Sequence, residues 1–88
     1  MVNIGDVVDR RMGAGGPVMK MVVVAIGDNL LYCCPQEWNP KLDRPLDTWR
    51  KAFYKGCCWT FDLKTGVEED AELKWGVAFG RTGTYLEL

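Results

Sequence analysis

Alternating apolar and polar residues predict short β-strands in the first third of the chain. Residues 4–11 show this alternation, and residues 18–26 form an almost continuous apolar, β-branched run typical of a central strand. Residues 30–34 then read as a third strand, after the turn residues Gly27-Asp28-Asn29, which tolerate positive φ angles. The pattern therefore predicts a β-hairpin over residues 17–34.

The clearest alternation in the chain covers residues 57–63 and predicts a further strand. Its core face is expected to carry Cys57, Trp59, Phe61 and Leu63, with Cys58 outside. After a turn at Thr65-Gly66, residues 68–73 are expected to form one acidic helical turn. Two last short strands are predicted at residues 76–79 and 84–88, around the turn residues 80–83.

A different spacing of apolar residues predicts one short helix between the strands. Leu46, Trp49 and Phe53 recur at helical intervals, so that we expect a helix over residues 46–54. Asp43 is a candidate N-cap, Pro45 suits the helix start, and Gly56 is expected to end the helix.

Length and composition favour a single, mainly β domain. A chain of 88 residues has room for one hydrophobic core, and its ten glycines and four prolines imply many tight turns between short elements. We therefore predict one β-barrel domain over residues 1–88, in which residues 35–55 form an insertion with the short helix and residues 75–88 a C-terminal extension.

The charge distribution disfavours nucleic acid as a partner. The chain has a net charge of −1 and no histidine, so it lacks the positive field that attracts phosphates. Residues 1–55 hold eight basic against six acidic side chains and residues 56–88 three against six, which suits an anionic ligand or self-association into a homo-oligomer. The alternative is scattered surface charge that only serves solubility. The amino terminus lacks signal-peptide features and no apolar run approaches a membrane span, which predicts a cytoplasmic protein without membrane contact.

Two adjacent cysteine pairs, Cys33-Cys34 and Cys57-Cys58, leave three interpretations open. They are a cross-strand disulfide, a four-sulfur zinc site, or small buried apolar side chains. Neighbouring residues on a strand point to opposite faces, whereas zinc sites separate their paired cysteines by two or more residues. The spacing therefore favours buried thiols, and we predict no metal site.

Parts of the sequence resemble the YodC-like family of small bacterial proteins, whose function is uncharacterised. The likeness lies in Ile4-Gly5-Asp6-Val7-Val8, in Gly15-Gly16-Pro17-x-Met19, and in Cys57-Cys58-Trp59-Thr60-Phe61 with Lys64 and Glu69-Asp70-Ala71-Glu72-Leu73. The resemblance covers residues 4–26 and 57–73 and implies a small SH3-like β-barrel of about five short antiparallel strands. It implies no catalytic residues.

The only segment rich in ligand-binding residue types runs from Trp38 to Lys55. Without histidine the commonest general base is missing, and the carboxylates and cysteines form no convincing catalytic set, so we expect no enzyme and no cofactor. Aromatic rings and guanidinium groups together suit a stacked, anionic ligand. The candidate ligand-binding residues are Trp38, Arg44, Trp49, Arg50, Lys51 and Tyr54. The alternative is that Trp49 and Phe53 only pack the helix onto the barrel.

The sequence thus predicts a non-enzymatic binding module and leaves its ligand open. The first hypothesis is binding or sequestration of an anionic, nucleotide-like small molecule, completed by a second subunit. The second is a protein-interaction or peptide-interaction adaptor that uses a barrel groove or the edge strand near the C-terminus. The third is binding of single-stranded nucleic acid through the same aromatic residues.

Overall fold

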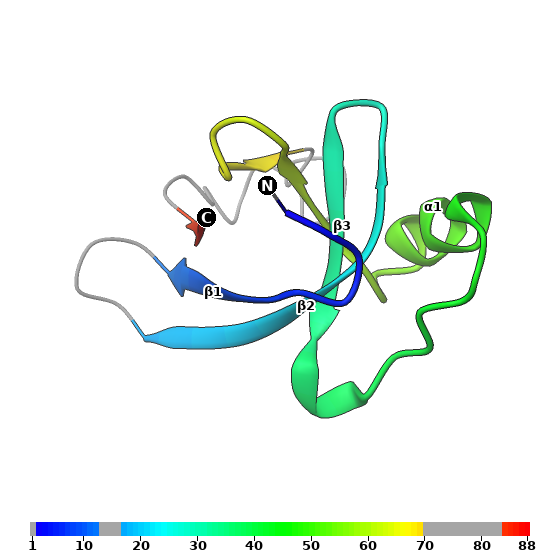
Figure 1. Ribbon diagram of the computed structural model, residues 1–88, viewed down its shortest axis with the longest axis horizontal. Helices are drawn as coiled ribbons and strands as arrows, with labels where there is room; N and C mark the ends of the chain where they lie inside the picture. Colours follow the sequence, from blue (N-terminus) through cyan, green and yellow to red (C-terminus); the bar gives the residue numbers. More distant parts are fainter. Residues whose placement is uncertain (1, 13–16, 70–83) are drawn as a thin grey trace.

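The computed structural model describes residues 2–12, 17–69 and 84–88 (Figure 1). In this part of the chain six antiparallel strands form one sheet in the order β5-β4-β3-β2-β1-β6. The elements are β1 (Val7–Met12), β2 (Val18–Gly27), β3 (Leu30–Pro35), the 3₁₀ helix η1 (Gln36–Trp38), α1 (Leu46–Tyr54), β4 (Trp59–Asp62), β5 (Glu68–Glu69) and β6 (Thr84–Glu87). The mainly β architecture with one short α-helix confirms the predicted fold class.

β2 is the central strand, as the apolar run predicted. It pairs with β1 along one edge and with β3 along the other, and the β2–β3 hairpin closes at the pair Gly27↔Leu30. Asp28 and Asn29 form the two-residue turn with φ angles of 56° and 61°, which right-twisted hairpins favour. The predicted hairpin is confirmed, including the residues that make its turn.

The two outer strands of the sheet meet and nearly close a barrel. Val67, beside β5, forms a bridge with Tyr85 of β6, and the Leu86 N–H donates to the Gly66 carbonyl at 2.8 Å. Gly66 has a φ of 76°, and a Cβ placed there would lie 2.6 Å from the Leu86 carbonyl oxygen. Only glycine therefore permits this close approach.

Apolar residues are buried on both faces of the sheet, which explains the near-continuous apolar run of β2. The cluster inside the barrel consists of Met21, Val23, Leu31, Cys33, Phe61 and Leu86. The cluster on the other face lies under α1 and consists of Val22, Val24, Ala25, Tyr32, Cys34, Trp49, Phe53 and Cys58. Figure 1 shows α1 against the β2–β3 hairpin on this second side.

α1 has the predicted bounds, and its buried residues Trp49 and Phe53 hold it against the sheet. Gly56, with a φ of 79°, follows the helix as expected. The predicted Asp43 cap is wrong, because Pro45 occupies the N-cap position and no side chain caps the helix. No helix among the described residues is both long and apolar enough to cross a membrane.

β1 begins at Val7, three residues later than predicted. The segment before it turns instead of extending: Gly5 has a φ of 96°, and the Asp6 N–H donates to the Asn3 carbonyl at 3.1 Å. This turn still contacts β2, since Gly5 N–H donates to Val23 O and Val23 N–H donates to Asp6 O. The alternation over residues 4–6 therefore reflects a turn fixed to the sheet.

The predicted orientation of the cysteines before β4 is wrong. Cys58 is fully buried in the cluster under α1, whereas Cys57 is exposed. The strand starts only at Trp59, so the period-2 pattern does not extend back to Cys57. From Trp59 on the prediction is confirmed, because Phe61 is fully buried inside the barrel and Trp59 and Leu63 pack partly against the same cluster.

The predicted acidic helical turn is also wrong at its start, where Glu68 and Glu69 form β5 and pair with Phe61 and Thr60. The strand at Thr84–Glu87 is confirmed. The expectations for residues 70–73, 76–79 and 80–83 lie outside the described residues.

A buried ion pair crosses the interior of the barrel. Arg10 of β1 places its Nη2 2.6 Å from Oε1 of Glu68 in β5, and the two side chains are only 7% and 3% exposed. Thr84 of β6 donates its hydroxyl to the same carboxylate oxygen at 2.7 Å. The Arg10 guanidinium also lies over the rings of Trp59 and Phe61, 5.8 and 5.7 Å from their centroids. One polar group thus connects β1, β4, β5 and β6.

We expect Glu68→Gln to destabilise the protein by about 3–5 kcal/mol, because it leaves the Arg10 charge buried without its counter-charge. Urea unfolding followed by tryptophan fluorescence measures this loss. The double variant Arg10→Met with Glu68→Leu removes both charges and should recover most of the lost stability. As a control, Glu87→Gln disrupts the exposed pair between Arg11 and Glu87 and should change stability little. Equal effects of Glu68→Gln and Glu87→Gln would contradict the assigned role of the buried pair.

Candidate functional site

The six predicted ligand-binding residues do not gather in one place. Trp38 lies in η1, where its exposed ring tilts against Trp59 at a centroid distance of 5.5 Å. Arg44 is exposed in the segment before α1, and Trp49 is buried beneath the helix. Lys51 forms an exposed ion pair with Asp47 along α1, at 3.2 Å. None of these four lines the pocket that holds the remaining two.

Arg50 and Tyr54 do come together, at a small pocket between α1 and the end of the sheet. The pocket has a volume of about 210 Å³ and is lined by Asp28, Leu30, Tyr32, Arg50, Phe53, Tyr54 and Thr60. Arg50 forms an ion pair with Asp28 of the hairpin turn. The hydrogen bond to Asp28, followed by that to the Tyr32 hydroxyl, raises the pKa of Arg50. Tyr54 is 78% exposed, so its ring is available for stacking.

This arrangement limits what the Arg50 pocket can bind. Its volume lies below the roughly 300–1,000 Å³ of common small-molecule sites. The carboxylate of Asp28 already neutralises the guanidinium, so an anion has to displace it. Trp49 is only 7% exposed and packs in the core, which confirms the structural alternative for this residue.

A second feature, which the sequence analysis did not assign, is an open edge of β2. β3 pairs with β2 only as far as Met21↔Pro35, after which the chain turns into η1. The preceding residues, Val18 to Lys20, pair with β1 on their other side. In the described part of the chain no strand pairs with Val18, Met19 or Lys20 along the β3 side.

The hydrogen bonds of Val23 show which backbone groups point into this open edge. Val23 exchanges backbone hydrogen bonds with Gly5 and Asp6, on the β1 side of the strand. Successive residues of a strand direct their N–H and C=O groups to alternate sides, and β2 is regular up to this residue. The backbone N–H and C=O groups of Met19 and Met21 therefore point toward β1. Val18 and Lys20 direct their backbone groups away from β1, into the space beyond the end of β3.

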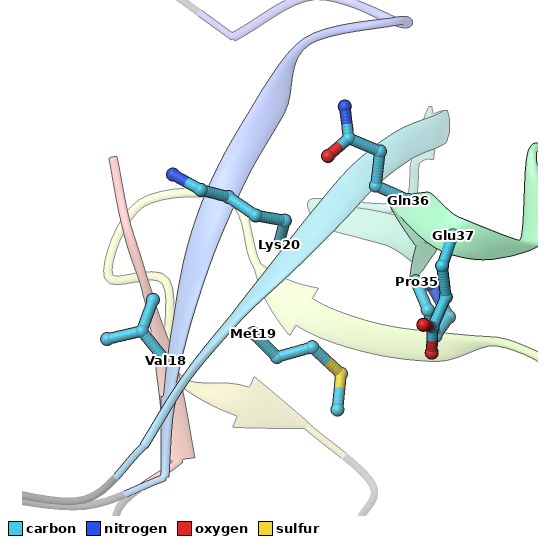
Figure 2. Close-up of a pocket in the computed structure, with 6 residues that line it drawn as sticks. All are labelled: Val18, Met19, Lys20, Pro35, Gln36 and Glu37. Carbon is cyan, nitrogen blue, oxygen red and sulfur yellow. The ribbon is translucent and has the colours of Figure 1, made fainter.

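A groove of about 580 Å³ runs along this edge, lined by Val18, Met19, Lys20, Pro35, Gln36 and Glu37. Figure 2 shows the side chains of Met19 and Glu37 directed to one side of β2, and those of Lys20 and Gln36 to the other. We call this groove the β2-edge groove. It lies between an unfinished strand edge and η1.

The β2-edge groove exposes apolar side chains of β2. Val18 and Met19 are 45% and 39% exposed, although they lie in the central strand. Lys20 forms an ion pair with Asp9 of β1 at 2.5 Å. Glu37 forms no ion pair with any other described residue. The groove thus offers backbone hydrogen-bonding groups, apolar side chains and one unpaired carboxylate.

The sequence feature that could have predicted this open edge is the unequal length of the two hairpin strands. The hairpin closes at Gly27↔Leu30, and the returning strand ends at Pro35. After Pro35 the chain turns into η1 at Gln36. The first residues of the apolar run therefore have no described strand as a partner on the β3 side. The strands predicted at residues 18–26 and 30–34 already differed in length.

In the described part of the chain no side-chain cluster resembles a metal centre. The described residues contain no group of three or more Cys, Asp and Glu side chains that could hold an ion. No disulfide joins the four cysteines. Burial raises the pKa of the Cys33 thiol well above its usual range, so this sulfur stays protonated and unreactive at neutral pH.

Comparisons with known proteins add no relative to this picture. No protein-family model, curated protein or solved structure matches the chain. The resemblance to YodC-like proteins stays a prediction from the sequence.

Proposed function

We propose that this protein is a non-enzymatic interaction module that binds an extended peptide along the open edge of β2. The observation that carries the proposal is the direction of the Val18 and Lys20 backbone groups into the β2-edge groove. This is the adaptor hypothesis of the sequence analysis, moved from the C-terminal strand to the centre of the sheet.

Strand addition supplies binding free energy from the backbone. A peptide strand beside β2 meets an N–H and a C=O from each of Val18 and Lys20, and each hydrogen bond contributes about 0.5–1.5 kcal/mol. Its alternate side chains fall on the two sides of the groove, next to Met19 on one side and next to Val18 and Lys20 on the other. Backbone pairing provides the affinity, and the lining side chains provide the selectivity.

The shape of the groove favours a single extended segment over a folded partner's sheet edge. Gln36 and Glu37 line the groove opposite β2, so that a bound segment lies between β2 and η1. A flexible terminus or linker of another protein meets this requirement.

The test starts with selection of binders from a library of random heptapeptides displayed on phage, followed by titration calorimetry of the synthesised peptides. Val18→Pro removes one donor that points into the groove while the adjoining pairs with β1 keep their bonds, and proline is tolerated at the first residue of a strand. We expect it to weaken the selected peptides about tenfold. Val18→Thr keeps the N–H and should bind like the wild type.

Two results would contradict the proposed function. One is a library that yields no peptide for the wild-type protein. The other is a selected peptide that binds Val18→Pro and the wild type equally well, because backbone pairing at this edge would then contribute nothing.

A second candidate function is binding of an anionic, nucleotide-like molecule at the Arg50 pocket. It is supported by the partly exposed guanidinium of Arg50 beside the exposed ring of Tyr54. The phosphate would take the place of the Asp28 carboxylate, and the base would stack on the tyrosine.

Calorimetry with a panel of cyclic and linear nucleotides tests this candidate. Arg50→Ala should lower the affinity about tenfold or more, since a hydrogen bond to a charged group contributes roughly 1.5–3 kcal/mol. Lys51→Ala is the matched control, because it removes the neighbouring cation that does not line the pocket. Absence of binding to the wild type at high micromolar concentration rules the candidate out.

A further inference from the structure

Glu37 forms no ion pair with a basic side chain among the described residues. Asp9, Asp28, Asp47, Glu68 and Glu87 each form an ion pair with a lysine or arginine. Glu37 takes part in none of these pairs, is exposed, and lines the β2-edge groove. Its carboxylate is therefore available to a cation that enters the groove.

The register of an added strand determines which residue reaches this carboxylate. Directly opposed residues of neighbouring strands place their side chains on the same face, so the residue opposite Met19 lies on the side of Met19 and Glu37. Met19 directs its own backbone groups toward β1, which makes this a non-hydrogen-bonded pair with its Cα atoms about 4.5 Å apart. The central side chain of the peptide therefore lies between Met19 and Glu37.

Met19 and Glu37 together suit one type of side chain. The partly exposed Met19 offers apolar surface to a methylene stem, and Glu37 offers a carboxylate to a positive end group. We propose that the peptide carries a lysine or arginine opposite Met19, held by Glu37; this inference rests on the proposed function.

The other side of the groove restricts the two flanking positions. The peptide residues before and after the basic one point toward Lys20, Val18 and Gln36. Lys20 is already paired with Asp9 on this side, and Val18 offers apolar contact. The preferred motif is thus one basic residue between two uncharged, β-branched residues.

Calorimetry with three capped peptides tests this specificity: Thr-Thr-Val-Lys-Val-Thr-Thr and its counterparts with Glu or Gln in place of Lys. For the wild type we expect the Lys peptide to bind about tenfold more tightly than the Gln peptide, and the Glu peptide to bind most weakly. Glu37→Gln should remove the preference for Lys, and Glu37→Lys should reverse it in favour of the Glu peptide. Asp47→Asn makes a similar charge change on α1, outside the groove, and should leave the order unchanged.

The outcomes separate this inference from the proposed function. If all three peptides bind the wild type and Val18→Pro weakens them, but Glu37→Lys leaves their order unchanged, the inferred role of Glu37 is overturned and edge binding stands. If selected library peptides bind while none of these three does, the basic motif is overturned. If neither the library nor these peptides bind, both the proposed function and the inferred basic motif are overturned.

Discussion

The guanidinium of Arg10 lies inside the barrel, where a charge is tolerated only when a counter-charge meets it. Glu68 supplies that counter-charge, and Thr84 shares the same carboxylate oxygen. Arg10 Nε has no hydrogen-bond partner among the described residues, so the pair is not fully compensated by other polar groups. An arrangement that keeps Arg10 in the interior but separates it from Glu68 leaves a buried, unpaired charge. Closure of the barrel therefore brings the Arg10 charge and its counter-charge together.

This constraint extends to the β2-edge groove through the strand register. Arg10 pairs with Met19, the central residue of the open edge, and also with Leu86 of β6. β1, which pairs with Val18 to Lys20, is thus held to β5 and β6 across the barrel interior. A strand edge held in this way needs little ordering when a peptide binds, which reduces the entropic cost of association. Closure also pairs the outer strands with each other, and no described strand pairs with the overhang of β2.

The elements of the fold could be predicted from local patterns, and the polar contacts between them could not. The β-branched run of β2, the Asp28-Asn29 turn and the helical spacing of Trp49 and Phe53 each have one dominant physical cause within a few residues. Cys57 and Cys58 were misassigned because the burial of Cys58 depends on α1, an element that packs from elsewhere in the sequence.

The candidate site was predicted from residue types alone, and types do not determine proximity. Of the six residues chosen, only Arg50 and Tyr54 line one pocket, because Trp49 points into the core and Lys51 points along the exposed side of α1. The sequence prediction overlooked Arg10, although Arg10 lies on the same inward face of β1 as Val8. Its partner Glu68 lies 58 residues away, beyond the reach of any local pattern.

The claim that the edge of β2 is open is tested most directly by amide hydrogen exchange, followed by NMR on the free protein. The account predicts rapid exchange at the Val18 and Lys20 amides, which point into the groove, and slow exchange at Met19 and Met21, whose amides face β1. This alternation between neighbouring residues is specific to a strand paired on one side. Equal protection of all four amides would contradict it, because the edge would then be covered in solution.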